Sequence, residues 1–211
     1  NSITIDTTNY VSELCFIGGS YGTDKSIFNN KTPFNHSYTS VYNIIFSHLR
    51  DKDINFAEIG ILDNASIKMW RDYFTQAKID GYENSKKLLS NAKNDNLKDT
   101  RYFEIDVKNS DNITNAFLKS DKFYDVIIDD STHLFQDQMN IINVSKNFLK
   151  PGGYLIIEDI FSKKRMYSEK KFFEAIKNIK SEFNDIFFIN CKNKYNYGGI
   201  WFNHKILVFI K

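Results

Sequence analysis

The chain has 211 residues, of which 42% are hydrophobic, 16% aromatic and 26% charged. A chain of this length can bury about 70% of its unfolded surface in one core. Only nine Gly and two Pro exclude collagen-like and Pro-rich disordered proteins. The net charge of +2 comes from interleaved basic and acidic residues, without the clustered basic surplus of a nucleic-acid binder. We therefore expect one globular domain and no nucleic-acid partner.

The sequence pattern predicts neither a targeting signal nor a pair of bonded or metal-binding cysteines. The longest apolar runs, such as residues 154–157 and 206–210, are too short to cross a bilayer. The opening sequence NSITIDTTNY has no basic stretch followed by an apolar segment, so no signal peptide is expected. Cys15 and Cys191 have no neighbouring Cys or His, which argues against zinc and favours buried thiols. These features predict a cytoplasmic protein without a membrane span.

The elements alternate between strand and helix from residue 54 onward. Short runs rich in β-branched and aromatic residues predict strands at 54–59, 78–83, 102–106, 124–129 and 154–158. Helical spacing of apolar residues predicts helices at 66–74, 85–92, 113–119 and 134–149. This alternation is typical of right-handed βαβ crossovers, and it predicts an α/β fold with a mostly parallel sheet and helices on both faces.

The two ends of the chain add further elements. A helix is predicted at 168–183, followed by an antiparallel pair of strands at 185–191 and 205–211, which makes seven strands. Helices at 10–16 and 40–49 precede the sheet and are separated by a Gly- and Asn-rich loop at 18–37. Loops of that length are commonly functional, so we expect this one to close over a site. The prediction is one structural domain, with a helical lid extension at 1–50 and a core at 51–211.

Acidic residues end all five strands of the parallel part. They are Glu58, Glu83, Asp106, Asp129 with Asp130, and Glu158 with Asp159. Ligands of open parallel sheets bind at these carboxyl ends, beside the first strand. Gly60 would allow close approach of a ligand there, and Glu83 could accept hydrogen bonds from both hydroxyls of a ribose. Because GxGxxG is absent, a nucleoside-containing cofactor without phosphates is favoured.

Several motifs occur in chain order over nearly the whole sequence. They are YGTDK at 21–25, His36 with Tyr38 and Tyr42, EIGI at 58–61, KMWRDYF at 68–74, DDSTH at 129–133, and KPGG at 150–153 leading to Glu158 and Asp159. In this order they resemble the class I S-adenosylmethionine-dependent methyltransferases. The nearest likeness is to metal-dependent O-methyltransferases of macrolide sugars, whose relatives include cephalosporin hydroxylases. The resemblance implies a Rossmann-like fold with seven strands in the order 3-2-1-4-5-7-6.

The resemblance also implies roles for individual residues. Those predicted to bind S-adenosylmethionine are Glu58, Gly60, Ile61, Asn64, Glu83, Asp106 and Asp129. Those predicted to bind Mg²⁺ or another divalent cation are Asp130, Glu158 and Asp159, and His133 is the predicted base. Those predicted to contact substrate or to order the lid are Thr23, Lys25, His36 and Tyr38. Asn64 and Ser131 replace two glycines of the family pattern. Asn tolerates a left-handed backbone, so Asn64 can take the place of a glycine. Ser131 is less suited to that role, and a change in the shape of its loop is an alternative.

The chemistry of the strand ends supports a metal and a base independently. Carboxylates at Asp130, Glu158 and Asp159 would repel one another unless a cation or protons lie among them. Mg²⁺ favours oxygen ligands and retains waters, which leaves positions for two substrate hydroxyls. A neutral His133 could remove the hydroxyl proton as oxygen attacks the methyl group. The alternative is that Asp129 and Asp130 cap the next helix and His133 is a surface residue.

The acceptor remains open at this level. A sugar hydroxyl is favoured, on a nucleotide-linked sugar, a surface polysaccharide or a glycosylated natural product, and the basic stretch 162–165 would suit an acidic acceptor. Alternatives are N-methylation of an amine, O-methylation of a catechol-type small molecule, and a non-catalytic cofactor-binding homologue. Hydroxylase chemistry is disfavoured because no 2-His-1-carboxylate set is evident. The oligomeric state is open, a homo-oligomer included.

Overall fold

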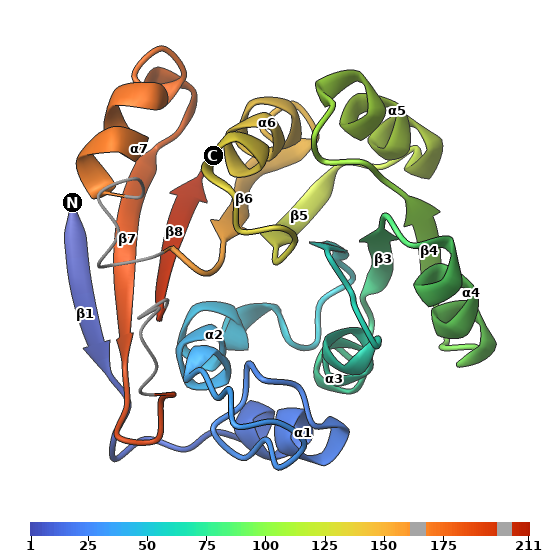
Figure 1. Ribbon diagram of the computed structural model, residues 1–211, viewed down its shortest axis with the longest axis vertical. Coiled ribbons are helices and arrows are strands. Elements are labelled where there is room, and N and C mark those ends of the chain that lie inside the picture. Colours follow the sequence, from blue (N-terminus) through green and yellow to red (C-terminus); the bar gives the residue numbers. More distant parts are fainter. Residues whose placement is uncertain (161–167, 198–203) are drawn as a thin grey trace.

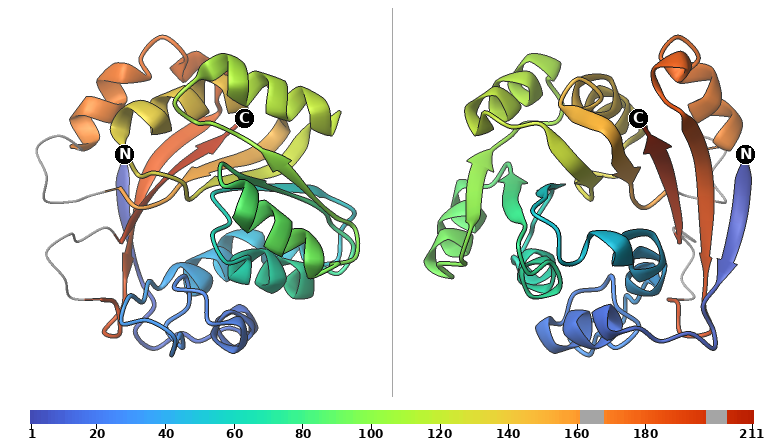
Figure 2. Two further views of the ribbon diagram at one scale, coloured as in Figure 1. Left: turned by 45° about the vertical axis from the view of Figure 1, so that its right-hand side comes forward. Right: turned by 180° about the vertical axis from the view of Figure 1, so that it is seen from behind.

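The computed structural model describes residues 1–160, 168–197 and 204–211. Its centre is an eight-stranded sheet that lies between two layers of helices (Figure 1, Figure 2). The strands are β1 (Ser2–Asp6), β2 (Asn55–Ile59), β3 (Lys78–Glu83), β4 (Thr100–Glu104), β5 (Tyr124–Asp129), β6 (Leu149–Ile157), β7 (Asp185–Lys192) and β8 (Lys205–Ile210).

The helices form one layer on each face of the sheet. They are α1 (Glu13–Tyr21), α2 (Tyr38–Phe46), α3 (Ala65–Tyr73), α4 (Lys86–Asn94), α5 (Ser110–Ser120), α6 (Phe135–Ser145) and α7 (Glu169–Ala175), with short 3-10 turns at Ser47–Leu49 and Lys180–Glu182. Figure 1 shows α1, α2 and α3 on one side of the sheet and α5, α6 and α7 on the other. Buried side chains accordingly form two apolar clusters, one on each face. No helix in the described ranges is long and apolar enough to cross a membrane.

The sheet has the order β1-β7-β8-β6-β5-β2-β3-β4. All neighbouring strands are parallel except β8, which is antiparallel to both β6 and β7. The α/β fold, the mostly parallel sheet and the order of the seven predicted strands are therefore confirmed. The prediction missed β1, which lies parallel to β7 at the edge of the sheet, with Ser2 opposite Phe188. Most of β1 is exposed, so its sequence lacks the apolar run of a buried strand.

Some predicted boundaries are wrong. The helix predicted at 134–149 ends at Ser145, and β6 already begins at Leu149, which lies opposite Tyr124 of β5. Phe148 and Leu149 continue the apolar spacing of α6, but they pair with β5 instead, where Tyr124 N donates to Phe148 O at 2.8 Å. The first helix begins at Glu13 instead of residue 10, and it ends where Gly22 adopts a left-handed conformation with φ 70°. The helix predicted at 168–183 is α7 followed by a separate 3-10 turn.

The N-terminal helices share the core of the sheet. Leu14, Val41 and Phe46 are fully buried in the same apolar cluster as Phe56 and Trp70. The Phe46 ring lies edge-on to Trp70, with 6.2 Å between the ring centroids. Contacts of this kind hold α1 and α2 against one face of the sheet.

Candidate functional site

A cavity of about 620 Å³ opens at the edge of the sheet where β2, β3 and β5 end. Its lining comes from six segments that are far apart in sequence. They contribute Thr23, Asp24 and Phe34 before α2; Gly60, Ile61 and Leu62 after β2; Glu83, Asp106 and Val107 after β3 and β4; and Asp130, His133 and Asp159 after β5 and β6. The cavity therefore lies at the switch point of the sheet, where the sequence predicted ligand binding.

Gly60 permits these loops to meet. Its φ is +88°, and a Cβ there would lie 2.3 Å from the backbone oxygen of Asp130. The sequence interpretation assigned this glycine to close approach of a ligand; the structure shows that the chain's own loop after β5 makes the approach. Only glycine provides both the backbone conformation and the space.

Glu83 links two walls of the cavity. Its Oε1 accepts a hydrogen bond from Ser85 N at 2.9 Å, and its Oε2 accepts one from Leu62 N at 3.3 Å. Each carboxylate oxygen has a second acceptor position. Glu83 thus lies with Ile61 and Asp106 on the wall where the sequence predicted the cofactor.

Other residues of the predicted cofactor set are buried and are not among those that line the cavity. Asn64 has φ 68°, the left-handed conformation that the sequence led us to expect, and its Nδ2 donates to Asp95 Oδ2 and Tyr102 Oη at 2.8 Å each. Asp129 is buried and accepts hydrogen bonds from both the backbone N and the Oγ of Ser131, so Ser131 braces the loop in place of the family's glycine. Direct contact of Asn64 and Asp129 with the cofactor stays a prediction.

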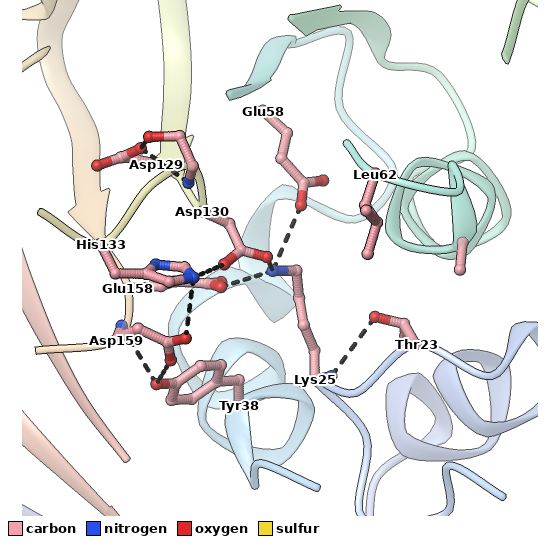
Figure 3. Close-up of polar contacts among 12 residues, drawn as sticks. Thr23, Lys25, Tyr38, Glu58, Leu62, Asp129, Asp130, His133, Glu158 and Asp159 are labelled. Carbon is pink, nitrogen blue, oxygen red and sulfur yellow. Dashed lines mark hydrogen bonds and ion pairs between the residues drawn. The ribbon is translucent and has the colours of Figure 1, made fainter. Parts of the chain in front are cut away.

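Lys25 lies at the centre of the carboxylate cluster (Figure 3). Its Nζ contacts Asp130 Oδ2, lies 2.5 Å from Glu158 Oε2 and is 3.4 Å from Glu58 Oε1. Glu158 also accepts a hydrogen bond from the Tyr42 hydroxyl. The sequence required a cation or protons among the carboxylates, and the structure supplies the ammonium of a lysine that was predicted to contact substrate or lid.

Burial affects the pKa values of this cluster strongly. It would lower the pKa of Lys25, but the carboxylates of Asp130, Glu158 and Glu58 outweigh it and raise that pKa well above its ordinary value. It raises the pKa of Glu58 to about 7, although the Lys25 ammonium opposes the shift. The Trp70 indole donates to Glu58 Oε2 at 2.8 Å, which satisfies one oxygen of this fully buried carboxyl group. The carboxylates therefore keep Lys25 charged, whereas burial is the main cause of the raised pKa of Glu58.

His133 lies between two carboxylates on the cavity wall. Its Nε2 is 3.5 Å from Asp159 Oδ2 and 4.0 Å from Asp130 Oδ1. Burial would lower the pKa of His133, but Asp159, Asp130 and Asp129 outweigh it and raise that pKa. Among the described residues, ligand atoms of Asp130, His133 and Asp159 lie within 4.8 Å of one another, close enough to hold a metal ion. The structure thus brings two of the three predicted metal ligands together with the predicted base.

The remaining predicted contacts lie beneath Asp159. The Tyr38 hydroxyl donates to Asp159 Oδ1 at 2.7 Å, and the Tyr38 ring stacks on His36 with 4.8 Å between centroids. His36 Nδ1 lies 2.9 Å from His204 Nδ1. Sequence reasoning missed His204, because only the fold brings it to a residue 168 positions earlier. The basic stretch 162–165 lies outside the described residues.

Curated relatives of the chain are sugar O-methyltransferases. The chain is 25% identical over 135 residues to the 8-demethyl-8-(2-methoxy-alpha-L-rhamnosyl)-tetracenomycin-C 3'-O-methyltransferase of Streptomyces olivaceus, covering 60% of this chain and 33% of that protein. It is 23% identical over 142 residues to the mycinamicin VI 2''-O-methyltransferase of Micromonospora griseorubida, covering 64% and 34%. The chain thus spans about a third of the length of the curated relatives that it matches.

Two solved structures share the fold. The mycinamycin-pathway methyltransferase MycE, in complex with Mg, SAH and mycinamycin VI, matches with a TM-score of 0.71 at 16% identity over 95% of this chain and 54% of that one. The fibrillarin pre-rRNA processing protein of Methanococcus jannaschii matches with a TM-score of 0.56 at 15% identity, over 77% and 68%. The family model described as "Methyltransferase domain" matches residues 64–202, more than half of the chain. The chain therefore belongs to the methyltransferase-domain family, as the resemblance predicted.

Proposed function

We propose that the protein transfers the methyl group of S-adenosylmethionine to a hydroxyl group of a sugar. The observation that carries this proposal is the position of His133, which lies between Asp130 and Asp159 on the wall of a cavity that continues to Glu83. The sugar O-methyltransferases to which the chain is similar support the choice of acceptor.

The cofactor end of the cavity fits a nucleoside. Ile61 and Val107 offer apolar wall surface to a purine, and Glu83 retains acceptor positions for a ribose diol. Asp106 lies on the same wall, next to Val107. When bound, S-adenosylmethionine would supply the methyl group, whose bond to sulfur breaks as the bond to the acceptor oxygen forms.

His133 acts as the general base in this proposal. It accepts the proton of the sugar hydroxyl as the oxygen attacks the methyl carbon. Asp130 and Asp159 stabilise the imidazolium that results, because both carboxylates lie within 4.0 Å of Nε2. The cavity walls align acceptor and donor, which contributes to the rate by removing unproductive orientations.

A divalent cation fits part of the predicted ligand set. Asp130 and Asp159 offer the oxygen donors that Mg²⁺ prefers, and they lie with His133 in a group of metal-binding size. Both oxygens of Glu158 are engaged, one by Lys25 and the other by Tyr42. Asp130 and Asp159 each have one oxygen near His133 instead, so these two residues would hold the ion. A bound Mg²⁺ would orient and acidify the acceptor hydroxyl as a Lewis acid.

Turnover of a panel of acceptors tests the proposal. Purified protein, S-adenosylmethionine and Mg²⁺ are incubated with free sugars, nucleotide-linked sugars, glycosylated macrolides, catechols and amines, and release of S-adenosylhomocysteine is measured. We expect turnover with a sugar acceptor and loss of at least about a hundredfold in kcat for His133→Ala, with cofactor affinity retained. The control is His48→Ala, which alters an exposed histidine. Turnover of catechols or amines alone, or an active His133→Ala, would contradict the proposal.

Removal of divalent ions tests the metal separately. Excess chelator is expected to abolish turnover, and added Mg²⁺ to restore it. Asp159→Asn is expected to weaken Mn²⁺ binding, measured by electron paramagnetic resonance, whereas Glu158→Gln, which alters a group engaged by Lys25, has a smaller effect. Unchanged activity in chelator would remove the metal from the proposal and leave the base in place.

A further inference from the structure

We propose that Lys25 and Tyr38 are positioning residues that orient the two carboxylates flanking His133. The proposal rests on the proposed function, because it treats His133 as the base. Both residues belong to the N-terminal segment, defined here as residues 7–50. This segment lies outside residues 64–202, which the methyltransferase-domain model matches. The proposal therefore places part of the catalytic arrangement outside the matched domain.

Each flanking carboxylate has one oxygen bound by the N-terminal segment and the other near His133 (Figure 3). Lys25 Nζ binds Asp130 Oδ2, and Asp130 Oδ1 lies 4.0 Å from His133 Nε2. The Tyr38 hydroxyl donates to Asp159 Oδ1 at 2.7 Å, and Asp159 Oδ2 lies 3.5 Å from the same Nε2. Because a carboxylate is planar, holding one oxygen limits the direction of the other.

Lys25 is well suited to hold Asp130. Its side chain is 1% exposed, and its ammonium also contacts Glu58 and Glu158, which come from β2 and the end of β6. The Asp130 side chain is 22% exposed on the cavity wall and would rotate more freely without this contact. An ammonium bound to carboxylates at the ends of β2 and β6, the two strands on either side of β5, is a fixed anchor, because these partners prevent it from following Asp130.

Tyr38 holds both the backbone and the side chain of Asp159. Its Oη accepts a hydrogen bond from Asp159 N at 3.3 Å in addition to donating to Oδ1. Asp159 and His133 both have φ 56°, a left-handed conformation that non-glycine residues adopt only where surrounding contacts hold them. Tyr38 supplies such contacts to Asp159, and through Asp159 it acts on the orientation of the base.

Tyr38→Phe, which removes only the hydroxyl group, tests the positioning role of Tyr38. The ring that stacks on His36 is retained, so the fold is expected to persist. We expect kcat to fall by about ten- to a hundredfold, with the acceptor KM and the cofactor Kd within threefold of the wild-type values. The matched control is Tyr73→Phe, which removes another buried hydroxyl, bonded to Asn43 Oδ1 at 3.0 Å, and should leave kcat unchanged.

A second readout does not require an acceptor. The chain has four histidines, so ring ¹⁵N signals of labelled protein can be assigned with single histidine variants. Tyr38→Phe is expected to shift the His133 ring signals, and Tyr73→Phe is expected to leave them in place. Unchanged His133 signals in Tyr38→Phe would overturn this part of the inference. Absence of sugar turnover by the wild type would instead contradict the proposed function and leave the spectral comparison valid.

A double variant that keeps the net charge unchanged tests the positioning role of Lys25. The double variant Lys25→Met/Glu158→Gln removes the ammonium together with one of the carboxylates that it neutralises. We expect a folded protein with shifted His133 signals and kcat reduced by about tenfold or more. Wild-type signals and kcat would overturn the role of Lys25, and failure of the double variant to fold would assign Lys25 to stability instead of positioning.

Discussion

Gly60 combines a left-handed backbone conformation with close packing against the loop after β5. Gly60→Ala would combine a left-handed alanine with a Cβ only 2.3 Å from the Asp130 backbone oxygen. We expect a loss of about 3 kcal/mol in the free energy of unfolding, together with weaker cofactor binding, since the loop after β5 must move. Urea unfolding and calorimetric titration with S-adenosylhomocysteine measure the two effects.

A second glycine provides the control for that substitution. Gly152 has φ +77° but nothing within 4 Å of its would-be Cβ, so Gly152→Ala retains only the backbone cost of about 1–2 kcal/mol. Equal destabilisation by the two variants would show that the close approach of the loop is unimportant.

Glu58 makes stability depend on pH in a direction opposite to that of most salt-bridged carboxylates. Its pKa of about 7 in the folded protein exceeds the ordinary value of 4.5, so the folded state binds the proton more tightly than the unfolded state. The contribution is complete below about pH 4.5 and is lost as pH rises to about 7. Between about pH 4.5 and 7, the unfolding free energy of Glu58→Gln should therefore fall by about 3 kcal/mol less than that of the wild type.

Unfolding measured at several pH values tests this expectation, with the exposed residue Glu174 as control. Glu174→Gln is expected to follow the wild-type curve. A Glu58→Gln curve parallel to that of the wild type would contradict the raised pKa.

At the scale of elements, the central strands could be predicted from sequence because they are buried, whereas their order came from the resemblance to methyltransferases. Residues 126–128 of β5 and 155–157 of β6 are continuous buried runs, the pattern of strands covered on both faces. β1 has no such run and gains its place only by pairing with β7, so no local signal identified it. The start of β6 was missed because apolar residues after α6 suit either element until Pro151.

The site was predictable where its residues follow strands. Gly60, Glu83, Asp130, His133 and Asp159 all occupy strand ends, and the fold brings strand ends together. The partners of Lys25 could not be predicted, because Asp130 and Glu158 lie 105 and 133 positions later in the chain. A lysine in a loop looks like any exposed lysine until the fold encloses it.

At the scale of the whole molecule, the N-terminal segment contributes to the core as well as to the site. Without residues 1–50, the apolar surface around Phe56 and Trp70 would be exposed, and Glu158 would lose its contact with Lys25. We expect residues 51–211 alone to bind anilinonaphthalene sulfonate and to lack near-ultraviolet circular dichroism, as a molten globule does. Deletion of residues 1–6 is the control, since β1 is mostly exposed, and should preserve cooperative unfolding. Cooperative unfolding of residues 51–211 would contradict this expectation.

The pairing of β1 with β7 has a consequence for synthesis on the ribosome. β1 is made well before β7, yet the two strands lie side by side, and beyond them the Thr7 hydroxyl donates to Lys192 O across 185 positions. At about 5–20 residues per second, β1 waits roughly ten seconds or longer for its partner. This edge of the sheet is therefore completed only after β7 has been made, and β1 pairs long after its own synthesis.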